Sequence, residues 1–230
     1  AGKQGERSGG VGGGLARVGA DGAEGEGAVV LCGQTASRPG LETAGRLTHA
    51  GQAYDGPSDD ETAEGALRRA ARHERDRMLS VACALAEADG VDVTPDDLEI
   101  SVGSTPSMAA FTNAERDGFR VTEIRPGNYV MHDAMQVALG AATLGDCALT
   151  VLTTVVSTQQ KPDGTAHAFV DAGKKVFTTD TGYGTDGHGI ALADAAQMRP
   201  HPGLRVDHLS EEHGWLTMTG DADLTVGDRL

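Results

Sequence analysis

Several signals of membrane or secreted proteins are missing from these 230 residues. No apolar run approaches the ~18 residues of a transmembrane helix. The first residues, Ala-Gly-Lys-Gln-Gly-Glu, lack the apolar segment of a secretory signal peptide. The three cysteines, Cys32, Cys83 and Cys147, form no Cys-x-x-Cys pair and no disulfide framework. These absences favour a cytoplasmic protein. The length of 230 residues suffices for one large domain, or for one domain and part of another.

Basic residues are scarce, and lysine is the scarcest of them. The chain has 19 basic and 34 acidic residues, a net charge of −15, and its only lysines are Lys3, Lys161, Lys174 and Lys175. Nucleic acid and anionic membrane surfaces are therefore not expected as partners, because binding phosphate groups needs the opposite sign of charge. Hydrophobic residues make up 39% of the chain and charged residues 23%, so a folded core is expected rather than disorder.

Common catalytic signatures are also missing. We find no serine-hydrolase elbow, no Walker loop and no Gly-x-Gly-x-x-Gly at a strand end. Thirteen of the 33 glycines fall within the first 40 residues. Residues 1–27 show no apolar periodicity, which predicts a flexible Gly-rich segment.

Residues 41–130 alternate between strand and helix patterns. Apolar residues recur at helical spacing over 59–89, after a capping box at Ser58–Glu61. A shorter helix is predicted near 108–116. Strands are predicted at 41–47, 98–102 and 121–124. This order is typical of parallel βα units, whose ligand groups lie at the carboxyl ends of the strands.

Two polar motifs follow predicted strands. Gly103-Ser104-Thr105 offers amides and hydroxyls that could cradle a phosphate, with an ordinary capped turn as the alternative. The loop Thr48–Tyr54 places His49, Gln52 and Tyr54 close together in sequence. It could orient a small polar ligand or be an ordinary surface loop.

Residues 140–230 change to a β-rich pattern, which predicts a small antiparallel domain. Strands are predicted at 148–156, 167–170, 175–179, 204–208, 215–218 and 224–226. A hairpin turn is predicted at Pro162–Gly164. Ser210–His213 could bind a metal or serve acid–base chemistry, with a solvated turn as the alternative. Lys174 and Lys175 could form ion pairs with Asp171 and Asp180.

Six segments, taken in order, resemble one enzyme family, the D-threonine aldolase and D-serine dehydratase family. These segments are Gly45–Tyr54, Ser101–Pro106, Glu123–Val130, Asp133–Gly140, Val170–Gly173 with Lys175, and Leu209–Gly214. The resemblance implies an alanine-racemase-like α/β fold. The chain would supply the C-terminal part of a (β/α)8 barrel at 28–139, then a C-terminally truncated β domain at 140–230.

The resemblance also implies a cofactor and a reaction. Gly103, Ser104 and Thr105 would hold the phosphate of pyridoxal 5′-phosphate. Four further residues would lie near the cofactor: His49, Gln52, Tyr54 and Tyr129. The implied enzyme is a lyase that cleaves D-β-hydroxy amino acids to glycine and an aldehyde. The alternatives are a D-serine dehydratase, which yields a keto acid and ammonia, and a non-catalytic remnant that only binds.

Two expected parts of the family's machinery are missing from the sequence. The lysine that forms an imine with the cofactor lies in an Arg-Pro-His-x-Lys motif, and the divalent metal (Mn, Mg or Zn) is held by His-x-Cys or His-x-Asp. Neither motif occurs here. The expectation is a chain truncated at both ends and inactive alone, with no catalytic or metal residue of its own. The full-length protein is expected to be a homodimer acting on a small D-amino acid.

Overall fold

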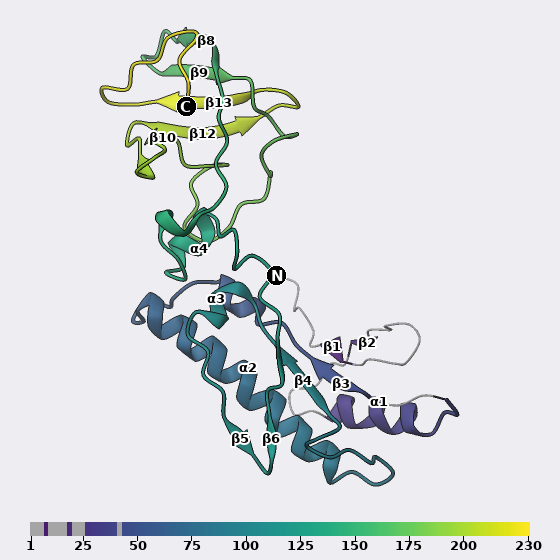
Figure 1. The fold of residues 1–230 in the computed structure, drawn as a ribbon. Coiled ribbons are helices and arrows are strands. Elements are labelled where there is room, and N and C mark those ends of the chain that lie inside the picture. The colour runs from purple at the N-terminus through teal and green to yellow at the C-terminus, as the bar shows by residue number, and fades with distance from the viewer. Residues whose placement is uncertain (1–6, 9–17, 20–25, 41–42) are drawn as a thin grey trace. The chain divides into compact units, whose positions relative to one another are not determined.

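The computed structural model describes residues 7–8, 18–19, 26–40 and 43–230. They belong to two compact units, unit 1 (Ala1–Tyr129) and unit 2 (Val130–Leu230) (Figure 1). The sequence places this division later, between residues 139 and 140. The short helix α4 (Ala134–Ala138) belongs to unit 2 because it packs on a loop of that unit, where a Cβ added to Gly184 would lie 2.5 Å from the Ala138 Cβ. Most of the predicted segment 1–27 lies outside the described residues.

The centre of unit 1 is a set of three parallel strands, as predicted. In register, Gly45 pairs with Glu99, and Ser101 pairs with Glu123. Two short strands extend the sheet in antiparallel fashion, and the order is β2-β1-β3-β4-β7. The strands are β1 (Arg7–Ser8), β2 (Val18–Gly19), β3 (Gly45–Leu47), β4 (Glu99–Val102) and β7 (Glu123–Ile124).

The long helix α2 (Ala63–Ala86) begins later than predicted. Its N-cap is Thr62, whose hydroxyl accepts the Gly65 N–H at 3.1 Å. The predicted capping box at Ser58–Glu61 is therefore wrong. Glu61 instead accepts two hydrogen bonds from the Arg69 guanidinium, at 2.9 and 2.7 Å, so its carboxylate does not cap the helix.

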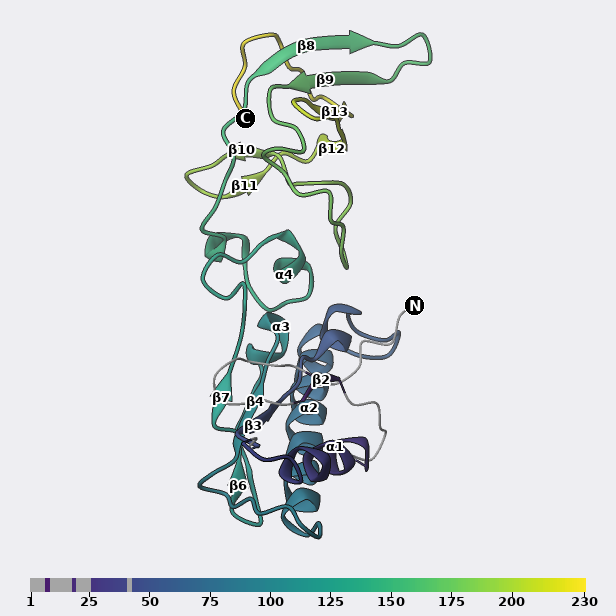
Figure 2. The same ribbon diagram turned by 90° about the vertical axis from the view of Figure 1, so that its right-hand side faces the viewer.

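Helices α1 (Glu26–Ala36) and α2 cover the same face of this sheet (Figure 2). The apolar stripe of α2 packs on β4, and the predicted alternation of β4 turns Ile100 and Val102 towards it. Burial of these side chains provides the main driving force for folding of unit 1. The largest buried apolar residues are Met78, Leu79, Val81, Leu85, Leu98, Ile100, Val102, Phe119 and Val121.

The helix predicted at 108–116 is wrong except at its first residue, and the segment ends in a β-hairpin. Helix α3 spans only Thr105–Met108, and the chain continues into β5 (Glu115–Arg116) and β6 (Phe119–Arg120). The two residues between these strands have positive φ, 51° at Asp117 and 84° at Gly118. This is the geometry of a type I′ turn, for which Asp-Gly is a preferred sequence.

Unit 2 contains a four-stranded antiparallel sheet in the order β12-β13-β9-β8 and a separate ribbon of β10 and β11. The predicted hairpin turn at Pro162–Gly164 is confirmed, because Lys161 N donates to Thr165 O at 2.8 Å beside it. The strands are β8 (Val155–Gln160), β9 (Ala166–Val170), β10 (Leu192–Asp194), β11 (Arg199–Pro200), β12 (Leu204–Leu209) and β13 (Gly214–Met218).

The core of unit 2 follows the alternation of its strands. Ala168 and Val170 of β9 and Leu216 of β13 face inwards, and the residues between them face outwards. The buried apolar residues are Val155, Ala168, Val170, Ala191, Leu204, Val206, Leu209 and Leu216.

Three predicted strands of unit 2 are wrong in whole or in part. Of 148–156, only the end enters β8, and Thr154 forms an isolated bridge with Arg229. Residues 175–179 begin with a turn, in which the N–H groups of Val176 and Phe177 both donate to Gly173 O. Residues 224–226 enter another turn, where Thr225 N donates to the Asp228 carboxylate at 2.7 Å. In these segments local side-chain and turn hydrogen bonds replace strand pairing.

One further helical turn, η2 (Leu144–Asp146), precedes the sheet of unit 2. In the described part of the chain no helix is both long and apolar enough to cross a bilayer.

Candidate functional site

Three loops leave the carboxyl ends of the parallel strands of unit 1. They are residues 48–54 after β3, 103–107 after β4 and 125–129 after β7. Because parallel strands end at one edge of a sheet, these loops are neighbours, as they are in other α/β ligand sites. The third loop is tied to the second, since Asn128 N donates to the Thr105 hydroxyl at 2.8 Å.

The first loop carries three of the predicted site residues. His49 and Tyr54 have nearly parallel rings, with centroids 5.9 Å apart and an angle of 5° between the planes. Gln52 lies on the intervening turn η1 (Gly51–Tyr54) and is exposed. Partial burial and the nearby Arg125 guanidinium lower the pKa of His49. Its imidazole is therefore neutral at neutral pH and can donate and accept hydrogen bonds.

The second loop carries the predicted phosphate-binding residues. Gly103 has φ of 136°, and a Cβ there would lie 2.9 Å from Arg125 N, so only glycine fits. Ser104 and Thr105 are buried. Ser104 caps α3 through a reciprocal pair with Ser107, in which the two hydroxyl oxygens are 2.9 Å apart. The capped turn, which was the alternative reading, is thus present.

Tyr129 stands at the end of the third loop. Its side chain is 59% exposed, and it follows the Asn128 that is anchored to Thr105. The structure therefore places Tyr129 directly after the attachment point between the second and third loops.

Arg125, at the start of the third loop, was not predicted to be a site residue. Its Nη2 donates to Thr48 O at 2.6 Å, and its Nε donates to the Ser101 hydroxyl at 2.5 Å. Glu123 lies 3.6 Å from the same Nε and also bonds the Ser101 hydroxyl. Arg125 thus links all three strand ends through charge-assisted hydrogen bonds.

Glu74, on α2, was also missed. Its carboxylate accepts the Gly103 N–H at 3.0 Å and lies 3.4 Å from the Ser107 hydroxyl, and the Ala50 N–H lies near enough to help lower its pKa. The residue is only 4% exposed. Burial raises the pKa of Glu74, an effect partly offset by these donors and by Arg125.

A sequence signal for Glu74 exists. It lies on the apolar stripe of α2, in line with Ala70, Ala71 and Met78, all of which are buried. A charged residue in such a stripe is rare unless it has buried partners. Arg125 lies in Glu123–Val130, one of the six segments that carry the family resemblance, but no local burial pattern marks it because its partners are distant in sequence.

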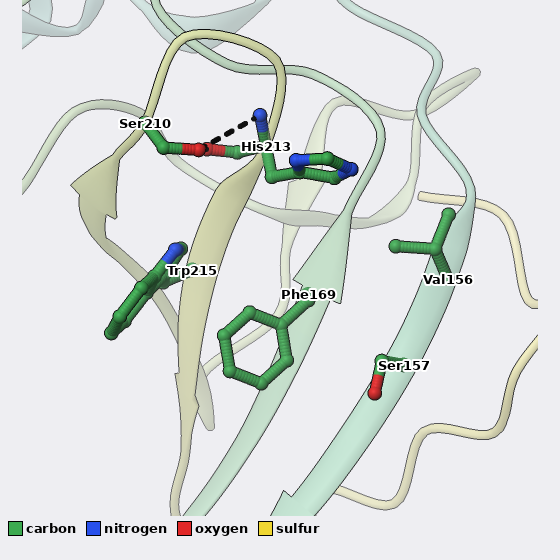
Figure 3. A pocket seen from close by; sticks show the side chains of 6 residues that line it. All are labelled: Val156, Ser157, Phe169, Ser210, His213 and Trp215. Atoms are coloured by element: carbon green, nitrogen blue, oxygen red, sulfur yellow. Dashed lines mark hydrogen bonds between the residues drawn. The ribbon is translucent and has the colours of Figure 1, made fainter.

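In unit 2 the predicted Ser210–His213 segment is the turn between β12 and β13. Ser210 N donates to His213 O at 2.8 Å, and His213 N donates to the Ser210 hydroxyl at 3.2 Å. This is the turn that the sequence left as the alternative. Next to it lies a pocket of about 430 Å³, lined by Val156, Ser157, Phe169, Ser210, His213 and Trp215 (Figure 3).

Among the described residues, neither Lys174 nor Lys175 forms the predicted ion pair with Asp171 or Asp180. Lys175 instead pairs with Glu212 of the turn. The Asp171 carboxylate accepts hydrogen bonds from Thr153 Oγ1 at 2.7 Å and Thr154 N at 2.8 Å, which lower its pKa. Within the described ranges, no three His, Cys, Asp or Glu residues are grouped so that they could hold a metal ion.

Comparison with known proteins decides the family. A family profile described as a putative serine dehydratase domain matches residues 148–230. D-threo-3-hydroxyaspartate dehydratase of Delftia sp. (strain HT23) is 31% identical over 205 residues, 88% of this chain and 50% of that protein. An uncharacterised protein of Mycobacterium tuberculosis is 34% identical over 102 residues, 44% of this chain and 71% of that protein. The chain belongs to the D-threonine aldolase and D-serine dehydratase family.

Solved structures place this family member among alanine-racemase-like folds. The Delftia enzyme superposes with a TM-score of 0.70 at 32% identity, covering 91% of this chain and 54% of that one. An alanine-racemase-like protein of Idiomarina loihiensis gives the same TM-score at 24% identity, covering 91% and 52%. The chain spans about half the length of the Delftia enzyme. The resemblance indicated by the six sequence segments is confirmed.

Proposed function

We propose that this chain supplies the cofactor-binding strand ends of a pyridoxal-phosphate-dependent lyase. The substrates would be D-β-hydroxy amino acids, and the products a keto acid and ammonia. In the same proposal, unit 1 is the later part of a barrel and unit 2 its β domain. The observation that carries the proposal is the meeting of loops 48–54, 103–107 and 125–129 at one sheet edge.

The residues at this edge fit a phosphorylated, planar cofactor in their chemistry. The Thr105 hydroxyl accepts the Asn128 N–H and can still donate its own proton to an anion. The Arg125 guanidinium adds positive charge. The parallel rings of His49 and Tyr54 suit contact with a heteroaromatic ring. We assign the phosphate to Gly103, Ser104 and Thr105, and the ring environment to His49, Gln52, Tyr54 and Tyr129.

Pyridoxal phosphate, when bound, supplies an electron sink for the charge that develops at the substrate α-carbon. The chain's own residues bind and orient. Arg125 keeps the first and second strand ends together through Thr48 O and the Ser101 hydroxyl. The lowered pKa of His49 favours the neutral imidazole, which can accept a hydrogen bond at one ring nitrogen and donate one from the other.

Dehydration is preferred here over the aldol cleavage predicted from the sequence motifs. The Delftia relative is a D-threo-3-hydroxyaspartate dehydratase, and the matching profile is described as a serine dehydratase domain. A variant of a D-threo-3-hydroxyaspartate dehydratase has also been solved in a form described as metal-free, which supports the expected divalent metal. We assign no residue of this chain to that metal.

The 230-residue chain alone is expected to form no imine with the cofactor. The Arg-Pro-His-x-Lys motif that carries the imine lysine in the family is absent from the sequence. We therefore expect borohydride treatment with one equivalent of pyridoxal phosphate to give no stoichiometric adduct on a single lysine. A stoichiometric adduct on one lysine would contradict this expectation.

A chimera tests the function. This chain replaces the aligned half of the Delftia dehydratase, which keeps its own remaining residues. The assay offers D-serine, D-threo-3-hydroxyaspartate and D-threonine, and measures keto acid, ammonia, glycine and aldehyde. We expect keto acid and ammonia from the first two substrates. A folded, cofactor-loaded chimera that releases only glycine and aldehyde supports the aldolase activity instead, and one without any turnover defeats the lyase proposal.

A further inference from the structure

We propose that Glu74 is the positioning residue of this site. Its buried carboxylate fixes loops 48–54 and 103–107 relative to each other, so that the candidate ligand residues share one edge. The identity of the ligand rests on the proposed function, whereas the positioning role rests on the geometry of unit 1 alone.

Groups from both loops lie around this one side chain. The Gly103 N–H donates to Oε1 at 3.0 Å, and the Ser107 hydroxyl lies 3.4 Å from Oε2. Ala50 of the first loop packs with Ala70 of α2 in one buried apolar cluster, and its N–H lies near the Glu74 carboxylate. A carboxylate only accepts hydrogen bonds, and its two oxygens offer about four sites. Glu74 can therefore accept the buried Gly103 N–H together with the Ser107 hydroxyl and still offer a site to the Ala50 N–H, which an apolar side chain cannot do.

The position of Glu74 is poorly explained by stabilisation of the apolar core alone. The neighbouring inward residues Ala70, Ala71 and Met78 pack as an ordinary apolar stripe. A charge at this depth is costly to bury, and an apolar residue of similar volume would pack on the sheet without that cost. Glu74 stands at the level of the strand ends, where the groups it binds belong to the loops and not to the core.

Arg125 adds a second contact to the first loop. Its guanidinium donates to Thr48 O, two residues before the Ala50 that packs on α2 beside Glu74. The glycine lets the two backbones approach, since a Cβ there would lie 2.9 Å from Arg125 N. The first loop is therefore bonded to Arg125 at Thr48 and packed on α2 beside Glu74 at Ala50, and Glu74 is bonded to Gly103 of the second loop.

Hydrogen exchange of the ligand-free chain tests the positioning role. The variants are Glu74→Leu, which removes the acceptor, and Glu74→Gln, which keeps one carbonyl oxygen. The matched control is Glu64→Gln, an exposed acid on the same helix. Leaving a buried N–H without a partner opens it to solvent more often. We expect amides in 48–54 and 101–108 to exchange at least about tenfold faster in Glu74→Leu, an intermediate change in Glu74→Gln, and none in the control.

The outcomes separate this proposal from the proposed function. The positioning role would be overturned if amide exchange in both loops of Glu74→Leu were unchanged. It would also be overturned if exchange in the distant strand β6 accelerated as much as exchange in the loops. If Glu74→Leu does not fold, the same comparison of loop and β6 exchange is made in Glu74→Gln. A titration with pyridoxal phosphate adds the second readout, and we expect about tenfold weaker binding by Glu74→Leu. If the unaltered chain binds no pyridoxal phosphate while the loops respond to Glu74, the proposed function fails and the positioning role stands.

Discussion

The two units bury different kinds of residue. Among the described residues, buried polar or charged side chains are concentrated in unit 1, and unit 2 contributes only Gln136 and Thr153 to this group. Those of unit 1 are Arg46, Thr48, Glu74, Ser101, Ser104, Thr105 and Ser107. Five of them lie at or next to the carboxyl ends of β3 and β4. The core of unit 2 is almost wholly apolar.

The apolar core of unit 2 serves stability, whereas the buried polar groups of unit 1 lie at the candidate site. In unit 2 the alternation of the strands accounts for the core, and its outward residues need no special partner. In unit 1 the apolar contact of α2 with β4 supports an edge where buried polar groups bond each other across loops. Buried polar networks fix a unique arrangement only when every member is satisfied. Substitutions in the apolar core of unit 2 and at the polar edge of unit 1 should therefore have different effects.

The largest expected effect is a cavity in the apolar core of unit 2. Leu216 is 2% exposed, and Leu216→Ala should lower the free energy of unfolding by about 2–5 kcal/mol. The control is Val226→Ala, at a side chain that is 65% exposed, which should change it by less than about 0.5 kcal/mol. Urea unfolding followed by circular dichroism measures both. Equal losses for the two variants would contradict the assigned core.

The next effect concerns the polar edge of unit 1. Arg125→Ala removes the donors to Thr48 O and the Ser101 hydroxyl, and should cost about 1–3 kcal/mol in unfolding free energy. Arg125→Lys should restore little, because an ammonium cannot reproduce the planar fork of two donors. Full stability of Arg125→Lys would contradict this prediction, because it would show that the positive charge alone holds the strand ends together.

The start of α2 gives a smaller effect. Thr62→Ala removes the N-cap that accepts the Gly65 N–H and should cost about 1 kcal/mol. Ser58→Ala, at the residue that the sequence pattern favours, should cost less than about 0.5 kcal/mol. Thermal unfolding of both variants under one set of conditions compares them. A larger loss for Ser58→Ala would restore the predicted capping box.

The smallest effect is a dependence on pH. Because burial raises the pKa of Glu74, the folded state holds this proton more tightly than the unfolded state. The resulting stability is fully present below the ordinary carboxyl pKa and is lost as pH rises through the raised value. The stability of the chain relative to Glu74→Gln should therefore fall between acidic and neutral pH. A relative stability that rises with pH would contradict the raised pKa.

The sequence predicts those parts of the fold that depend on local periodicity. The helical stripe of α2 and the alternation of β4, β9, β12 and β13 are visible because burial repeats at a fixed spacing. Segments 175–179 and 224–226 share the apolar composition of strands. They form turns because Gly173 O and the Asp228 carboxylate offer local partners to their amides.

The candidate site was predicted only in part for the same physical reason. Gly103, Ser104 and Thr105 are recognisable from their place after a strand. The partners that order them, Glu74 and Arg125, lie 29 and 22 residues from Gly103 in sequence, and only folding brings them together. A charged residue in an apolar stripe is the one local sign of Glu74. Arg125 has no such sign.

The most direct test of the central claim is amide hydrogen exchange of the unaltered chain with and without pyridoxal 5′-phosphate. The cofactor site proposed at the ends of β3, β4 and β7 predicts slower exchange in 48–54 and 103–107 when the ligand is present. The strands of unit 2 should be unaffected. Protection confined to residues 210–215 beside the pocket of unit 2, or no protection anywhere, would contradict the site.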